Sequence, residues 1–503
     1  MARIRAPEFP QDFVWLNSLP LSLKALRGRL VLLDFWTYGC INCLHILPDL
    51  KALEQKYASQ LTVIGVHSAK FDHEQDLQGV QQAIARHSIT HPVLIDQQFR
   101  IWQDYTVRAY PTLILIDPQG YIVATVSGEG HRSQLEGWID QLIAAQEDHS
   151  EWTLVNNPVI IQPLATPLAF PGKVLAAQDR LFIADSGHHR VVVTGRSHSL
   201  SGERVHDLQQ VIGTGTAGLQ DGTFEEAQFC NPQGMAWDER RSHLYITDTD
   251  NHVIRRVNFK TQTVETIAGT GQQNRSLSPQ QGSALTTALN SPWDLVKIDQ
   301  NLFIAMAGNH QIWRLNLTTQ QIQTFAGTGA EGCYDAIAPE AAFAQPSGIA
   351  TDGQRLFVAD SEGSSIRAVN LNPPFEVTTV CGSGDLYGFG DRDGKATAAR
   401  LQHCMGVAYD PNRLLWIADT YNHKIKRLDL TIQNCQTFYG SEELAEACDR
   451  PSLDEPAGVS LWEQTLYIAD TNHHRICWVD LGIGEMAIVI IPGLCSLDVC
   501  LPH

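Results

Sequence analysis

Two cysteines near the N-terminus have the spacing of a redox-active dithiol. Cys40 and Cys43 come directly after an apolar run of buried-strand length at 31–35 and open a segment, 43–58, with leucines at helical spacing. A thiol at a helix N-terminus faces unpaired backbone N–H groups and the positive end of the helix dipole, which favours the thiolate. Cys40 is therefore predicted to react near neutral pH, and Cys43, one turn on, is placed to resolve a mixed disulfide.

Two other interpretations of the pair stay open, namely half of a zinc site and two inert core cysteines. A structural zinc ion needs a second pair of ligands. Within the first 150 residues the remaining candidates are scattered histidines: His45, His67, His73, His87, His91 and His131. The strand-then-helix context favours redox chemistry, so we expect no metal ion and no cofactor other than the dithiol itself.

The elements that must position the dithiol alternate between strand-like and helix-like segments. Strands are predicted at 31–35, 61–66, 112–116 and 121–124, and helices at 43–58, 76–87 and 133–146. Strands separated by helices, with a final hairpin around the Asp117–Gly120 turn, predict an α/β sheet with helices on both faces. We place this domain at residues 1–150.

The first domain resembles the thioredoxin superfamily. Residues 31–43 look like the active-site strand and turn of that superfamily, and Pro48 matches the proline that kinks its active-site helix. Tyr110 and Pro111 match the loop that carries a cis-proline beside the dithiol. Ile41 and Asn42 differ from the Gly-Pro of thioredoxin and tune the reduction potential, so the resemblance does not imply the direction of electron flow. The segment 71–96 is closer to the branches that insert an extra helix there.

The resemblance also implies roles for individual residues. Cys40 is the nucleophile, Cys43 the resolving thiol, and Asp34 a buried carboxylate that shuttles the proton of Cys43. Pro111 holds the adjacent backbone open for an extended substrate segment. The implied substrate surface consists of Trp36, Gly39, Ile41, Asn42 and Tyr110. The alternatives are a solvated strand end for Asp34 and plain core packing for Trp36.

A repeat begins after about residue 150. Six copies of a Leu-aromatic-Ile/Val-Ala/Thr motif start at Leu181, Leu244, Leu302, Leu356, Leu415 and Leu466, and all but the third end on Asp. A repeat of roughly 50–65 residues with strands and no helices predicts a propeller blade, because a ring of blades buries the faces that one blade exposes. The fold class is therefore a multidomain chain, with an α/β domain followed by an all-β six-bladed propeller at 165–494.

The turns after these motifs resemble the NHL repeat. Asn-His pairs occur at Asn251-His252, Asn309-His310, Asn422-His423 and Asn472-His473, with Gly187-His188-His189 in blade one and Ser364-Ser365 in blade four. We expect the Asp and His side chains to hold turns through backbone hydrogen bonds. A linker is placed at 151–164 and a tail at 495–503. The domain order resembles the family of NHL-repeat-containing protein two and its bacterial relatives.

Charge and composition limit the classes of binding partner. The 503 residues carry a formal net charge of −19. An acidic chain without a Lys/Arg run is unsuited to nucleic acid, no apolar run is long enough for a bilayer, and residues 1–7 do not look like a signal peptide. We therefore expect a cytoplasmic protein with a protein partner, whose oligomeric state the sequence leaves open. The nine other cysteines are expected to pack in the core, with pairing of Cys495 and Cys500, or their docking on the dithiol, as a separate hypothesis.

Two functions remain in competition. The first is a thiol–disulfide oxidoreductase in which the propeller recruits or orients a protein substrate for the Cys40/Cys43 pair. The second is a non-catalytic scaffold in which both domains serve as docking modules. The intact set of Asp34, Pro48 and Pro111 around the dithiol favours the first. A metal-dependent hydrolase or lyase in the propeller has no supporting motif.

Overall fold

The computed structural model describes residues 3–145, 165–195, 197–198, 204–440 and 452–495. The chain divides into two compact units between Pro163 and Leu164, which confirms the predicted order of an α/β domain and a β-propeller. The predicted linker at 151–164, Cys448 and Cys500 lie outside the described residues. Across the described part of the chain, no helix has the length and apolar character needed to cross a membrane.

The first unit is built on a seven-stranded mixed sheet with the strand order β1-β7-β6-β3-β4-β5-β2. The strands are β1 (Ile4–Arg5), β2 (Val14–Leu16), β3 (Leu30–Trp36), β4 (Leu61–His67), β5 (Val93–Ile95), β6 (Thr112–Ile116) and β7 (Tyr121–Ser127). The helices are α1 (Ile41–Lys56), the 3-10 turn η1 (His73–Gln75), α2 (Leu77–Arg86), α3 (Arg100–Asp104) and α4 (Arg132–Ala144). All predicted elements are present, and β1, β2, β5, α3 and η1 are additions.

The central strand β3 separates two apolar layers. It pairs in parallel with β4 and antiparallel with β6. Val31, Leu33 and Phe35 belong to one core cluster, whereas Leu30 and Leu32 pack with apolar residues of α1 and α4 on the other side. Because side chains alternate along a strand, the next two positions on the α1 side, 34 and 36, lie beneath the start of that helix.

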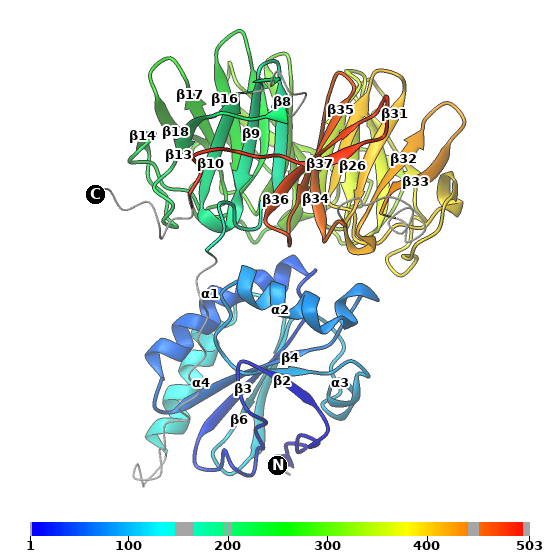
Figure 1. Cartoon of the computed structure of the whole chain (residues 1–503). Coiled ribbons are helices and arrows are strands. Elements are labelled where there is room, and N and C mark those ends of the chain that lie inside the picture. Colours follow the sequence, from blue (N-terminus) through cyan, green and yellow to red (C-terminus); the bar gives the residue numbers. More distant parts are fainter. Residues whose placement is uncertain (1–2, 146–164, 196, 199–203, 441–451, 496–503) are drawn as a thin grey trace. The chain divides into compact units, whose positions relative to one another are not determined.

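The second unit consists of six blades (Figure 1). Blade one contains β8 (Lys173–Ala177), β9 (Arg180–Asp185), β10 (Arg190–Gly195) and β13 (Leu208–Ile212). Blade two contains β15 (Pro232–Asp238), β16 (His243–Asp248), β17 (Val253–Asn258) and β18 (Thr263–Ala268). Blade three contains β20 (Pro292–Ile298), β21 (Asn301–Met306), β22 (Gln311–Asn316) and β23 (Gln321–Ala326). Blade four contains β25 (Pro346–Thr351), β26 (Arg355–Asp360), β27 (Ser365–Asn370) and β28 (Glu376–Cys381). Blade five contains β30 (Gly406–Asp410), β31 (Leu414–Asp419), β32 (Lys424–Asp429) and β33 (Asn434–Tyr439). Blade six contains β34 (Pro456–Trp462), β35 (Thr465–Asp470), β36 (Arg475–Asp480) and β37 (Met486–Ile488).

Short strands extend four of the blades at their outer edge, and in the described part of the chain the first and last blades exchange no strand. The additions are β14 (Gly222–Thr223), β19 (Gln281–Ser283), β24 (Ala336–Ile337) and β29 (Gly394–Lys395), and a separate ribbon pairs β11 (Ser197–His198) with β12 (Arg204–Val205). Each inner strand neighbours the next around the ring, and β34 of blade six lies beside β8 of blade one. The strand β37 completes blade six by pairing with β36.

The repeated Asp at the end of the second strand of a blade fixes the chain that enters the same blade. In five blades its Oδ1 accepts a hydrogen bond of 2.7 Å from a backbone N–H just before the inner strand. The pairs are Asp185 with Ala169, Asp248 with Cys230, Asp360 with Ala344, Asp419 with Gln402 and Asp470 with Asp454. Each Asp is fully buried and has a cation on the third strand. Blade three has Met306 and Gln311 instead, so the acid and the cation are missing together.

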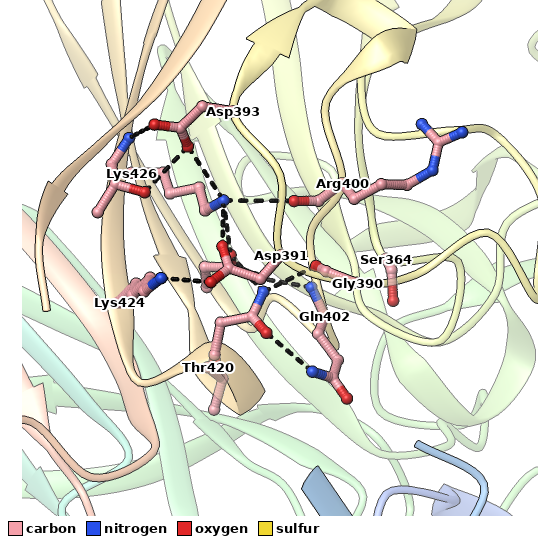
Figure 2. A network of polar contacts seen from close by, with 12 residues as sticks. Ser364, Gly390, Asp391, Asp393, Arg400, Gln402, Thr420, Lys424 and Lys426 are labelled. Carbon is pink, nitrogen blue, oxygen red and sulfur yellow. Dashed lines mark hydrogen bonds and ion pairs between the residues drawn. The ribbon is translucent and has the colours of Figure 1, made fainter. Parts of the chain in front are cut away.

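Blade five contains the most elaborate version of this arrangement (Figure 2). The ammonium group of Lys426 lies 2.8 Å from Asp391, 3.3 Å from Asp393 and 3.6 Å from Asp419. Burial opposes the charge, but the three carboxylates raise the pKa of Lys426 above its ordinary value. A buried charge is tolerated when it is paired in this way, so the network is a structural brace for the blade.

The repeated His connects one blade to the next. Four residues after the Asp position, its Nδ1 accepts a hydrogen bond of 3.0–3.2 Å from a backbone N–H of the following blade. The pairs are His189 with Asn231, His252 with Ser291, His310 with Gln345, His423 with Glu455, and His474 with Phe170, which closes the ring. In blade four the hydroxyl of Ser364 accepts from His403. The motif residue of blade six is therefore His474, not His473, and Ser364 follows Gly363 as the equivalent pair in blade four.

Candidate redox site

The two cysteines occupy the start of α1 as predicted. Cys40 is the N-cap residue with extended backbone angles and is half-buried, while Cys43 is completely buried one turn further on. Both are free thiols, and the N–H of Cys43 donates to the carbonyl of Cys40 at 3.1 Å. Pro48 lies inside the same helix. Within the described ranges no group of three or more His, Cys, Asp or Glu side chains is arranged to hold a metal ion.

Asp34 lies in the sheet beneath the dithiol. Its side chain is 0% exposed, and neither carboxyl oxygen has a hydrogen-bond partner among the described residues. Burial raises the pKa of Asp34 to about 7, against the opposing effect of His91. Burial, the neighbouring Cys40 thiol and the charge of Asp34 together raise the pKa of Cys43 well above that of an ordinary thiol. Asp34 is therefore not a solvated strand end but an ionisable group that titrates near neutrality next to a protonated thiol.

More buried polar atoms surround Asp34 than the sequence predicts. Trp36 Nε1, His67 Nε2 and His91 Nε2 are buried without a hydrogen-bond partner in the described part of the chain. Gly65 leaves room for two of these atoms, because a Cβ there would lie 2.9 Å from Trp36 Nε1 and 3.4 Å from His91 Nε2. Trp36 is 1% exposed and meets His67 edge-on at 5.1 Å. Burial lowers the pKa of His67 to about 3, so this imidazole is neutral at pH 7.

The loop between α3 and β6 completes the site. The Tyr110–Pro111 peptide bond is cis, as predicted. The Tyr110 hydroxyl donates to the carbonyl of Ser68 at 2.7 Å, and its ring packs on Trp102 with centroids 4.5 Å apart. Burial raises the pKa of Tyr110, and the charges of Glu74 and of both cysteines add to this shift. The described residues form no hydrogen bond with the backbone N–H or C=O of Tyr110.

A buried glutamate that the sequence analysis missed holds the loop before Cys40. Glu74, in η1, is 1% exposed and accepts backbone N–H hydrogen bonds from Gly39 at 2.9 Å, Lys70 at 2.6 Å and Phe71 at 3.0 Å. Burial raises the pKa of Glu74, and these hydrogen bonds oppose that shift. A single acidic residue in a polar segment carries no sequence signal of this role.

The predicted substrate surface divides into two groups. Asn42 and Tyr110 are partly exposed, whereas Trp36, Gly39 and Ile41 are buried. The buried three therefore lie within the fold, and Asn42 and Tyr110 are the members of the predicted set that have exposed surface.

Comparisons with known proteins agree with this architecture. The profile of the Thioredoxin-like family matches residues 28–122, and that of the NHL repeat matches residues 401–428. NHL repeat-containing protein 2 of Bos taurus is 39% identical over 529 residues, which cover 96% of this chain and 71% of that protein. The Arabidopsis thaliana protein SUPPRESSOR OF QUENCHING 1, chloroplastic, is 39% identical over 507 residues, and the chain spans about half of its length, 47%.

The N-terminal domain has smaller relatives of its own. Thiol-disulfide oxidoreductase ResA of Bacillus cereus is 31% identical over 127 residues, which cover 25% of this chain and 71% of that protein. These likenesses support a redox-type role for the first domain and a protein-interaction role for the propeller. The chain belongs to the family of NHL repeat-containing protein 2 and joins a thioredoxin-like domain to a six-bladed NHL propeller.

Proposed function

We propose that this chain is a thiol–disulfide oxidoreductase whose Cys40/Cys43 dithiol acts on a protein substrate that the propeller recruits or orients. The observation that carries the proposal is a fully buried, unpartnered Asp34 whose charge raises the pKa of the buried Cys43 thiol, one turn after a half-buried Cys40 at the helix N-terminus. A carboxyl group that titrates near neutrality beside a thiol that needs a base is typical of a site built for proton transfer.

In the reducing direction the dithiol acts on a substrate disulfide. The thiolate of Cys40 attacks one substrate sulfur, a Cys40–substrate disulfide forms, and the second substrate sulfur leaves as a thiolate. Asp34 accepts the proton of Cys43, and the resulting thiolate attacks the sulfur of Cys40. The Cys40–Cys43 disulfide forms as the first substrate sulfur leaves, so two electrons have passed to the substrate. The same steps in reverse oxidise a substrate dithiol.

The loop at Tyr110 supports binding of an extended substrate segment. Its backbone N–H and C=O are without hydrogen bonds in the described part of the chain. An extended peptide can pair with such groups as an added strand, with its disulfide held over Cys40. The propeller would then supply the selectivity, which accounts for a small substrate surface of Asn42 and Tyr110 at the dithiol itself. A cytoplasmic location remains a prediction from the sequence.

The test is single-turnover reduction of a fluorogenic disulfide peptide by the reduced full-length protein. Cys40→Ser is expected to abolish the reaction, and Asp34→Asn to slow release of the peptide without slowing its capture. Cys477→Ser, at a buried propeller thiol, is the matched control and should react like the wild type. If Cys40→Ser reacts as fast as the wild type, the proposal is wrong, and the alternative of a non-catalytic scaffold is favoured.

A further inference from the structure

One position of the inner strands differs between blades in a way that the NHL motif does not explain. It is the third residue of the Pro-x-Gly-type entry into each inner strand, and four blades have glycine there: Gly234, Gly348, Gly406 and Gly458. Blade one has Lys173 and blade three has Asp294 at the same position. The two exceptions carry opposite charges.

The glycines are required because the inner strands approach one another closely. A Cβ at Gly234 would lie 2.4 Å from the Cα of Asp294, and a Cβ at Gly458 would lie 2.8 Å from the Cα of Lys173. Both distances are shorter than real Cβ contacts. Four of the six strands thus have no side chain at this level, and the space left is occupied by Lys173 and Asp294.

The Lys173 side chain of blade one reaches backbone atoms of three other blades. Its buried ammonium group donates hydrogen bonds to the carbonyl oxygens of Ser347 at 2.9 Å, Ala457 at 3.3 Å and Met405. These oxygens belong to the inner-strand segments of blades four, six and five. An ammonium group has three N–H donors, so all three are used on main-chain carbonyls.

Asp294 supplies the negative charge and a further connection. Its Oδ2 lies 3.6 Å from Lys173 Nζ and accepts a hydrogen bond from the N–H of Ile349 in blade four at 3.2 Å. Its Oδ1 accepts from the N–H of Leu295 at 2.9 Å. The Lys173–Asp294 pair therefore links inner-strand segments of five of the six blades.

We propose that the propeller axis is a cation-binding site whose resident cation is the ammonium group of Lys173. The site consists of three carbonyl oxygens and one carboxylate, the oxygen donors that also suit calcium or potassium ions. Because the cation is covalently attached, the ring is held closed at any ionic composition, and the axis is blocked to ions and small ligands. Partners of the propeller would then bind to its faces or rim.

Thermal unfolding of the full-length protein with altered Lys173 tests the proposal. We expect Lys173→Ala to lower the melting temperature of the propeller by roughly 5 °C, because it leaves Asp294 buried and unpaired. Millimolar calcium or potassium chloride should restore most of the loss, whereas the wild type and Lys260→Met, an exposed control, should not respond. A destabilised Lys173→Ala protein that neither salt restores would overturn the cation site, as would a wild type that either salt stabilises.

Two further measurements apply if Lys173→Ala does not fold. The losses of stability in Lys173→Met and Asp294→Asn should be non-additive, so that the double variant loses less stability than the sum of the two single losses. Additive losses would contradict the pairing of Lys173 with Asp294. In the native wild type, acetylation mapped by mass spectrometry should modify Lys260 and leave Lys173 unmodified until the propeller unfolds. Modification of both at similar rates would show that the axis is open.

Discussion

Asp34→Asn separates the energetic effect of the buried carboxyl from the rest of the first domain. Burial raises the pKa of Asp34 from 3.8 to about 7. The folded state therefore retains a proton that the unfolded state releases, and stability falls as the pH rises from about 4 to 7 and stays low above that. The shift corresponds to about 4 kcal/mol when the group is fully ionised. Asparagine is neutral at every pH and lacks this dependence.

The difference between two pH values is the quantity to measure, because the desolvation of the asparagine amide is common to both. Between pH 5.5 and pH 8 the ionisation of Asp34 is expected to remove about 2 kcal/mol from the wild type and nothing from Asp34→Asn. Effects of other groups, such as His67, occur in both proteins and cancel. Hydrogen exchange of β3 peptides in the reduced full-length chain, corrected for intrinsic rates, reports this opening free energy.

Equal losses of stability in the wild type and in Asp34→Asn between these pH values would contradict the raised pKa of Asp34. Such a result would mean that Asp34 is ionised throughout the range, like an exposed carboxylate. It would also remove the basis for proton transfer from Cys43, since a base of ordinary acidity matches a buried thiol poorly.

Three further changes have defined outcomes. His67→Phe should reduce the loss of unfolding free energy at acidic pH, because keeping the buried imidazole neutral costs the wild type roughly 1.4 kcal/mol per pH unit below pH 6.5. Denaturation at pH 4.5 and pH 7 measures this loss in both proteins, and an equal loss in the two would contradict the role of His67. Glu74→Gln should lower the free energy of unfolding by about 2 kcal/mol and slow peptide reduction, because the amide cannot accept hydrogen bonds from all three N–H groups. Unchanged single-turnover rates would refute the positioning role of Glu74. His252→Ala should speed amide exchange at Ser291 about fivefold, and unchanged exchange would refute the connection between blades.

Most of the fold could be predicted from local patterns. The strand at 31–35 and the helix after Cys43 follow from apolar periodicity, and the six motif copies determine the number of blades. The elements that were missed, such as β1, β2 and α3, have two to five residues and no periodic signal. The hydrogen bond from the backbone to the motif His was predicted, but its location between two blades was not. A His that accepts a hydrogen bond from the next blade has the same local sequence as one that accepts a hydrogen bond within its own turn.

The sequence predicts the site residues that belong to recognisable motifs, but not the residues that other segments contribute to the site. Cys40, Cys43, Asp34 and Pro111 lie at elements with recognisable sequence patterns. The two cysteines interact with each other, the charge of Asp34 acts on Cys43, and Pro111 follows a cis peptide bond. His67 and Glu74 come from other segments, and their contribution depends on burial and backbone contacts that spacing does not encode. The same limit applies to Lys173 and Asp294, which are far apart in sequence and meet only because the ring closes.

Trapping of a mixed disulfide tests the central claim most directly. A full-length Cys43→Ser protein, which retains Cys40 and cannot resolve, is mixed with a disulfide-bonded peptide and mapped by mass spectrometry, with Cys40→Ser/Cys43→Ser as the control. The account predicts an adduct on Cys40 that persists in Cys43→Ser, is released within one turnover in the wild type and is absent from the control. If Cys43→Ser gives no adduct on Cys40, the dithiol is not an exchange centre.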